Sequence, residues 1–230
     1  MTAANREQTN LNNGYTTPRE SGLAEIKLKS EYPLDMFKEW HQEVKKSGHL
    51  TPDALVFSTT NREGRVTSRT VYLRRLESDG FVIMTDRRGR KARDLAECPQ
   101  ASIVFFWSYL KDGDVICSQV RAEGAVVELE PHQFQDLYDN EPLFCKIRSH
   151  LCRQGAPVED WQEYKARHDE LLQQWKQGEN TLPMPDHFVA YKLIPDVMDF
   201  YQAWGTNIGD RRLFVWDKEL EQWTSKRVQA

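Results

Sequence analysis

The sequence predicts an α+β fold that is mainly β, a small barrel with peripheral helices. Short runs rich in β-branched and aromatic residues recur along the first half of the chain and again near its end, and turns that contain glycine separate them. Two segments between these runs have the periodicity of amphipathic helices instead. A β-rich core interrupted by helices is typical of a barrel that carries helices on its outside.

The length of 230 residues suits one domain with a sizeable core. We expect residues 1–24 to form a flexible N-terminal tail, because they are rich in Asn, Thr, Gly and Ser, and residues 25–230 to form the domain. The net charge of −4 argues against a general polyanion binder, so we expect no nucleic-acid partner. The absence of a long apolar run or a signal peptide predicts a cytoplasmic protein with no membrane partner.

The four cysteines, Cys98, Cys117, Cys145 and Cys152, form no CxxC motif and show no tight pairing with the six histidines. Because a zinc site needs closely spaced Cys and His ligands, we expect no metal. The cysteines are predicted to be free thiols.

The first element is expected to be a helix with Asp35 as its N-cap. Met36, Phe37, Trp40 and Val44 follow at the spacing that places apolar side chains on one helix face. This face is predicted to pack against the barrel.

A meander of hairpins follows. Strands are expected at residues 55–60, 66–76 and 81–86, with turns at 61–64 and 77–80. Each turn contains the glycine that tight reversals favour.

A short helix at residues 90–98 should end at Pro99. The strand 101–110 carries a continuous apolar run, which predicts burial on both faces. A second long strand, 115–129, follows the loop at 111–114.

Two helices are expected next, at residues 131–139 and 158–177, with Pro131 at the start of the first and Gly178 after the second. The aromatic residues of the second helix, Trp161, Tyr164 and Trp175, are expected to pack in a core or an interface. Three closing strands are then predicted, at residues 188–204, 211–217 and 223–228.

The strongest charge signal lies at residues 85–95, where five cations occupy the seven positions from Arg87 to Arg93. A solvated helix face, a nucleic-acid patch and a pocket for one small anion are the alternatives. Basic side chains in the first helical turn oppose the helix dipole, but a bound anion would make them favourable. No aromatic residues alternate with these charges, as base stacking would require, so nucleic acid is disfavoured.

Two more features of the predicted strands favour a pocket. Arg69 lies in the middle of a predicted strand, where a charge needs a partner. Gln119 and Arg121 share one strand face by period-two alternation. An amide beside cations suits the mixed donors and acceptors of a flavin or nucleotide ring.

Along the chain, SRTVYLRR is followed by FVIMTDRRGRKARDL, ASIVFFW, SQVRAEG, FYQAW and GDRRLFV. In this order the motifs resemble the pyridoxamine 5′-phosphate oxidase family, from about Tyr32 to the C-terminus. The resemblance implies an FMN-binding split β-barrel, a homodimer, and a flavin site that draws residues from both chains.

The resemblance also implies the positions that contact FMN. They are Arg69, Thr70, Val71, Tyr72, Leu73, Arg74, Met84, Thr85, Arg90, Lys91, Gln119, Gln154, Gly155, Tyr201 and Arg211. Arg90 and Lys91 match the pair that holds the FMN phosphate. Met84, Gly155 and Tyr201 depart from the family's aromatic, serine and tryptophan, which should weaken the affinity without abolishing it.

The implied substrate positions depart further. They are Arg74, Leu137, Glu141, Cys145, Asn207 and Gly209. In the family, a lysine, a tyrosine, an arginine and a serine hold the substrate phosphate, and an R-x-H motif covers the reacting carbon. A register shift of one residue would put Tyr138 in place of Leu137. Since Glu141 replaces an arginine, phosphorylated B6 vitamers are expected to bind poorly.

The resemblance implies an FMN-dependent oxidoreductase that oxidises an amine or alcohol of a small-molecule substrate to an aldehyde with O₂. The family's ordinary reaction forms pyridoxal 5′-phosphate in vitamin B6 metabolism. The flavin carries this chemistry, so no catalytic side chain is identified. The alternative is a non-catalytic flavin-binding paralogue that has lost the B6-phosphate site, and heme or deazaflavin binding on the same fold is a third possibility.

Overall fold

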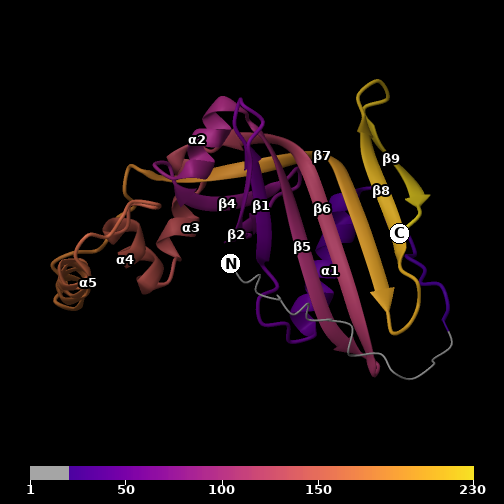
Figure 1. Ribbon diagram of the computed structural model, residues 1–230, viewed down its shortest axis with the longest axis horizontal. Coiled ribbons are helices and arrows are strands. Elements are labelled where there is room, and N and C mark those ends of the chain that lie inside the picture. Colours follow the sequence, from indigo (N-terminus) through magenta and orange to yellow (C-terminus); the bar gives the residue numbers. More distant parts are fainter. Residues whose placement is uncertain (1–20) are drawn as a thin grey trace, which may run out of the picture.

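The structure, a computed structural model, describes residues 21–230 (Figure 1). Most of the predicted flexible tail, residues 1–20, lies outside the described residues. Its last part pairs with the loop after β7: Ala24 N donates to Ile208 O at 2.8 Å, and Ile208 N donates to Gly22 O at 2.9 Å. The described chain is therefore anchored to the domain a few residues before Glu25, where the domain was expected to begin.

The described residues form one nine-stranded antiparallel sheet. Its strands are β1 Ala54–Thr60, β2 Val66–Tyr72, β3 Arg75–Leu76, β4 Phe81–Asp86, β5 Gln100–Lys111, β6 Asp114–Glu128, β7 Phe188–Trp204, β8 Asp210–Asp217 and β9 Gln222–Val228. The order is β2-β1-β5-β6-β7-β4-β3, and β8 and β9 branch from β7. Only Leu73 and Arg74 separate β2 from β3, so a single bent segment joins the two ends of this order and closes a barrel.

The long strand β7 splits the barrel on one side. One edge of β7 pairs with β6 along almost its whole length, whereas the other edge pairs with β4 at residues 188–193 and with β8 at residues 197–202. In Figure 1, β4 and β8 accordingly diverge from the two ends of β7. Gly124 lies where the register between β6 and β7 shifts, and a Cβ on it would lie 2.1 Å from Ile194 O. Only glycine fits this approach of two backbones.

The predicted strands agree with this sheet, with two corrections. The expected strand 66–76 is interrupted at Leu73 and Arg74, because the chain there leaves β1 and crosses to β4. The expectation that the strand after Pro99 is buried on both faces is wrong. In β5, Phe105 and Trp107 are buried in the core, but Phe106 and Leu110 are 61% and 72% exposed on the opposite face.

Helix α1, Pro33–Lys46, packs its apolar face on the sheet as expected. The Phe37 ring lies 4.9 Å from that of Phe81 and 4.8 Å from that of Phe105 between centroids, in the arrangement that aromatic pairs prefer. The predicted cap is wrong: Tyr32 is the N-cap, and the Asp35 carboxylate accepts a hydrogen bond from Ser30 instead. Pro33 at the first helical turn explains the earlier start.

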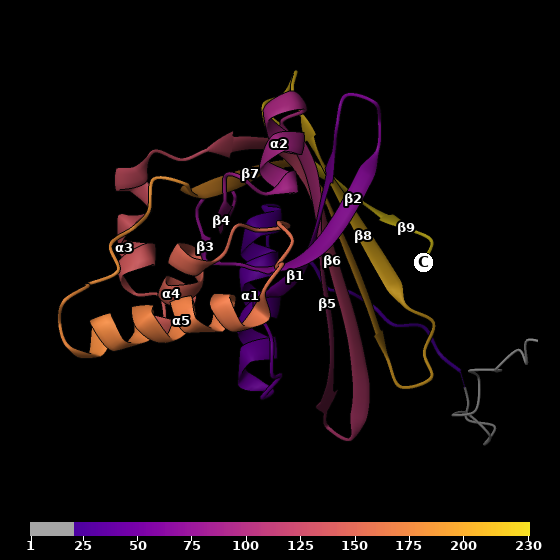
Figure 2. The ribbon, with the colours of Figure 1, turned by 60° about the vertical axis from the view of Figure 1, so that its left-hand side comes forward.

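The remaining helices are α2 Arg90–Glu97, the 3-10 turn η1 Pro131–Gln133, α3 Gln135–Asp139, α4 Leu143–Leu151 and α5 Trp161–Lys176. Figure 2 shows α3, α4 and α5 gathered on one side of the barrel and β8 and β9 on the other. The predicted helix 131–139 is divided at Phe134, and α4 was missed because it is short. No described helix has both the length and the apolar character needed to cross a membrane.

Helix α5 ends before Gly178, as predicted, and Asp160 caps its start. Its aromatic side chains do not reach the core of this chain: Trp161 is 65% exposed, and no residue of α5 is fully buried. The prediction that Trp161 packs in the core is therefore wrong. The other prediction for this side chain, that it packs in an interface, stays a prediction.

Candidate functional site

Two neighbouring cavities lie where β2, β4, α2 and the segment after α4 meet. The first, of about 600 Å³, is lined by Arg69, Arg88, Arg90, Lys91, Arg93, Arg153, Gln154, Gly155, Ala156 and Pro157. The second, of about 450 Å³, shares Lys91 and residues 153–156 with the first and continues past β2 and β4 to α4, α5 and the start of β7. The predicted residues from Thr70 to Tyr72, with Arg74, Met84 and Thr85, also line this second cavity.

Lys91 lies at the boundary of the two cavities. The residue is 4% exposed, and its Nζ donates to Thr85 Oγ1 at 2.8 Å and to Gln154 Oε1 at 2.5 Å. Burial, together with the nearby Arg69, lowers the pKa of Lys91 to about 8. Among the described residues no carboxylate forms a salt bridge with it, so this buried ammonium group favours the approach of an anion.

The start of α2 adds backbone N–H donors beside Lys91 that have no side-chain cap among the described residues. Gly89 is the N-cap and offers no side-chain cap, and the first turn contains no acidic residue. A Cβ on Gly89 would lie 2.6 Å from Gln154 Oε1, so glycine lets the two segments approach closely. Free N–H groups, a helix dipole and two cations together suit a phosphate group.

Arg69 closes the other wall of the first cavity. Its Nη1 donates to Thr59 Oγ1 at 2.8 Å and its Nη2 to Thr67 Oγ1 at 2.7 Å, while the Asp94 carboxylate lies 3.9 Å away. Burial and the neighbouring Arg90 lower the pKa of Arg69, whereas Asp94 opposes this shift. The guanidinium group predicted to need a partner is thus held by hydroxyl groups and a buried carboxylate of α2.

The turn after β4 is tied to the segment after α4. Arg88 Nη2 forms a salt bridge with Asp86 at 2.7 Å and also donates to Cys152 O at 2.8 Å. Burial alone would raise the pKa of Asp86, but the hydrogen bonds from Arg88 hold it below its ordinary value. This link keeps Gln154 next to Lys91.

Three of the predicted substrate positions, Arg74, Glu141 and Cys145, meet beside the far end of the second cavity, and of the three only Arg74 lines it. Arg74 Nη2 lies 3.0 Å from Glu141 Oε1 in a salt bridge. Burial, together with a hydrogen bond to Glu141, raises the pKa of the Cys145 thiol. Leu137 instead packs in an apolar cluster, and the hydroxyl of Tyr138 is buried against Ser149 Oγ and the carbonyl of Leu182.

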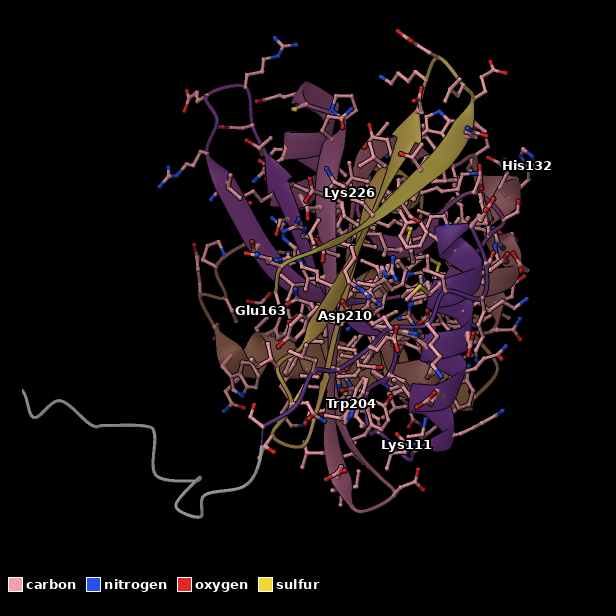
Figure 3. The ribbon with its side chains drawn as sticks, turned by 90° about the vertical axis from the view of Figure 1, so that its right-hand side faces the viewer. Lys111, His132, Glu163, Trp204, Asp210 and Lys226 are labelled. Carbon is pink, nitrogen blue, oxygen red and sulfur yellow. The ribbon has the colours of Figure 1, made fainter. Side chains whose placement is uncertain are left out.

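The remaining predicted residues form a second group on another part of the sheet. Gln119, Tyr201 and Arg211 are cross-strand neighbours on β6, β7 and β8. Arg211 Nε donates to Asp199 Oδ2 at 2.9 Å. Figure 3 shows this side of the molecule, with Trp204 and Asp210 labelled on either side of the turn between β7 and β8.

Asn207 and Gly209 lie in this turn and belong to the second group. A Cβ on Gly209 would lie 2.4 Å from the Tyr201 ring, so that ring occupies the space beside Gly209. Neither Asn207 nor Gly209 lines the second cavity. Arg69 on β2 and Gln119 on β6 have β1 and β5 between them, about 14 Å along the sheet. One chain therefore carries two separate groups of the predicted residues.

Several residues lining the second cavity were missed from the sequence. They are Arg148, Ser149, Cys152, Arg153, Tyr164, His187 and Phe188. Cys152 Sγ lies 2.9 Å from Tyr164 Oη, which joins α5 to the end of α4. Arg153 could have been found from its position beside Gln154, but the others come from α4, α5 and the start of β7, which only the tertiary structure brings together here.

The family model described as pyridoxamine 5′-phosphate oxidase matches residues 39–170 of the chain. The chain belongs to this family. A pyridoxine/pyridoxamine 5′-phosphate oxidase of Paraburkholderia phymatum is 30% identical over 183 residues, which cover 80% of this chain and 82% of the relative. One of Rubrobacter xylanophilus is 28% identical over 226 residues and covers 98% of both chains.

Solved structures confirm the split-barrel fold of this family member. PhzG from Burkholderia lata, solved in complex with tetrahydrophenazine-1-carboxylic acid, has a TM-score of 0.78 at 25% identity and covers 88% of this chain and 94% of its own. An FMN-binding protein related to pyridoxamine 5′-phosphate oxidase from Nostoc punctiforme has a TM-score of 0.64 at 15% identity, over 86% of this chain and 97% of its own. The second likeness shows the fold alone.

Proposed function

We propose that this family member binds FMN and is an oxidase of small molecules. The observation that carries the proposal is Lys91, a buried cation without a carboxylate partner among the described residues, beside the uncapped start of α2. A single phosphate monoester there would compensate the charge and accept hydrogen bonds from free N–H groups. Membership of the family supports the same cofactor.

The residues present fit FMN in a definite arrangement. Arg69, Arg90 and Lys91 would hold the phosphate in the first cavity. Thr70, Val71, Tyr72 and Arg74, with Thr85, would line the flavin ring in the second cavity, whereas the predicted Leu73 packs in the core. When bound, FMN would supply the ring that accepts a hydride from an amine or alcohol carbon and is reoxidised by O₂. The chain's own residues orient cofactor and substrate and exclude water.

A homodimer is part of the proposal. Gln119, Tyr201 and Arg211 lie on a different part of the sheet from Lys91, so one chain does not surround one flavin with both groups. Exposed apolar side chains, Phe106 and Leu110 among them, lie on the outer face of β5, next to β6. Pairing this face with a second copy would bury these side chains and bring the second group to the flavin.

The leading named reaction is the oxidation of pyridoxamine or pyridoxine 5′-phosphate to pyridoxal 5′-phosphate, in vitamin B6 metabolism. It rests on the named relatives, which the chain covers over four fifths of their length or more. The salt bridge between Arg74 and Glu141 argues for a different substrate on the same cofactor. The same salt bridge favours a second candidate function, a non-catalytic flavin-binding paralogue.

The test is the visible spectrum of the purified protein, with and without added FMN. A flavin band, and a titration that saturates at one FMN per chain, are expected. Lys91→Met should weaken FMN binding by about a hundredfold, because it removes a desolvated cation from the phosphate site. Lys38→Met, on the exposed face of α1, is the matched control and should leave binding unchanged.

A second step separates oxidase from paralogue. Pyridoxamine 5′-phosphate and a panel of other small amines and alcohols are added without oxygen, and bleaching of the flavin band is followed. Bleaching by any member establishes the oxidase and names its substrate. A flavin band that persists throughout favours the non-catalytic alternative, and no FMN binding at all overturns the proposed function.

A further inference from the structure

The salt bridge at the far end of the second cavity has a fixed position in the fold. Arg74 lies in the bend that closes the barrel, and its N–H donates to Val82 O at 2.8 Å. Its Nη2 lies 3.0 Å from Glu141 Oε1 and 3.2 Å from Glu141 Oε2, so the guanidinium group contacts both carboxylate oxygens. The backbone of Arg74 cannot turn away without opening the join between β2 and β4.

Glu141 is held just as firmly. It lies between α3 and α4, its N–H donates to Tyr138 O at 3.0 Å, and Pro142 follows it. Its side chain is only 4% exposed, compared with 27% for Arg74. A carboxylate this deeply buried needs its cationic partner, because breaking a buried pair leaves an uncompensated charge.

One further cation lies close to this pair. Arg148 Nη2 lies 3.7 Å from Cys145 Sγ, and the Cys145 thiol hydrogen-bonds to Glu141. Arg148 is exposed, so water screens its charge much more than that of Glu141. The charge that a ligand meets beside Arg74 is therefore dominated by the buried ion pair.

We infer that the Arg74–Glu141 pair sets the substrate class by rejecting an anionic group at this end of the cavity and accepting a neutral hydroxyl group. A phosphate that reached Arg74 would also face the Glu141 carboxylate, and their repulsion offsets the attraction. A hydroxyl group can accept a hydrogen bond from Arg74 and carries no charge for the nearby Glu141 carboxylate to repel. The inference rests on the proposed function and narrows it to unphosphorylated aromatic alcohols or amines that carry such a hydroxyl group.

The test compares the binding of 4-deoxypyridoxine and 4-deoxypyridoxine 5′-phosphate by titration calorimetry. Both compounds lack the oxidisable group, so binding is read without turnover. The wild-type protein should bind the unphosphorylated compound about tenfold more tightly or better. Glu141→Gln should gain about tenfold or more for the phosphate and change little for the unphosphorylated compound.

Two further variants serve as controls. Asp136→Asn removes a carboxylate of α3 that pairs with Arg75 at 3.3 Å rather than with Arg74, and should keep the wild-type preference. The double variant Arg74→Gln with Glu141→Gln leaves two amides and should lose the gain for the phosphate. It also replaces Glu141→Gln if the single variant does not fold, and it should then bind both compounds with similar affinity.

Each result decides the inference. A wild-type preference for the phosphate, or no gain in Glu141→Gln, overturns it. If neither compound binds the wild-type protein, a gain in Glu141→Gln for the phosphate alone still supports it. FMN titration of the same samples tests the proposed function separately, so failure of the cofactor assignment and failure of the ion-pair inference are distinguishable.

Discussion

The buried ammonium group of Lys91 gives the sharpest prediction about stability. Burial and the nearby Arg69 lower its pKa from 10.5 to about 8 in the folded protein. Lys91→Met keeps the length and the apolar part of the side chain and removes the charge. The variant should therefore differ from the wild-type protein in how its stability depends on pH.

The direction follows from proton binding. Between pH 8 and 10.5 the unfolded chain keeps the Lys91 proton while the folded protein has lost it, so the free energy of unfolding rises with pH in this window. Below pH 8 both states are protonated, and the folded protein holds a desolvated charge. The difference in pKa corresponds to about 3 kcal/mol, and screening by water at the cavity mouth reduces this to about 2 kcal/mol.

The assay is urea unfolding of the FMN-free protein at pH 7.5 and at pH 10.5. Other groups titrate in both proteins, so the readout is the difference between wild type and Lys91→Met at each pH. The wild-type protein should gain about 2 kcal/mol relative to the variant between the two values. Saturation with FMN should remove this gain, because a phosphate beside Lys91 raises its pKa again.

Parallel pH profiles of the two FMN-free proteins would refute this reasoning. They would mean that Lys91 keeps its ordinary pKa, through water or an anion in the cavity. Lys91 would then stabilise a bound phosphate no more than an ordinary solvated lysine does.

Three other changes probe the fold and the assembly. Gly124→Ala should lower the free energy of unfolding by about 2–3 kcal/mol, since the new Cβ would lie 2.1 Å from Ile194 O. A variant that unfolds at the wild-type urea midpoint would contradict this close approach. Asp94→Asn should lower the free energy of unfolding by about 1–3 kcal/mol in the same assay and should weaken FMN binding, because the Asp94 carboxylate accepts a hydrogen bond from Thr59 Oγ1 at 2.7 Å. An unchanged free energy of unfolding together with unchanged FMN affinity would argue against this hydrogen-bond network. Phe106→Asp, on the exposed face of β5, should convert the proposed dimer to a monomer in analytical ultracentrifugation. The far-UV circular dichroism spectrum should stay unchanged. A variant that remains dimeric would exclude this face as the interface.

Local sequence determined much of the fold. The runs of β-branched residues, the glycine-containing turns and the helical stripe around Phe37 depend on neighbours within a few positions. For the same reason the basic start of α2 could be interpreted before the structure was known: the placement of Arg90 and Lys91 in a first helical turn is a local property. The family resemblance then supplied residue positions that periodicity alone does not give.

Only the tertiary structure decided which residues meet. The apolar run in β5 predicted burial on both faces, yet Phe106 is exposed, because within a single chain β5 is covered on one face only. Arg74 and Glu141 lie 67 positions apart, and no local sequence pattern predicts a salt bridge between them. That contact depends on the closing bend of the barrel and on the turn between α3 and α4. Charge and periodicity are properties of the linear sequence, whereas the compensation of one buried charge by another depends on how distant segments pack.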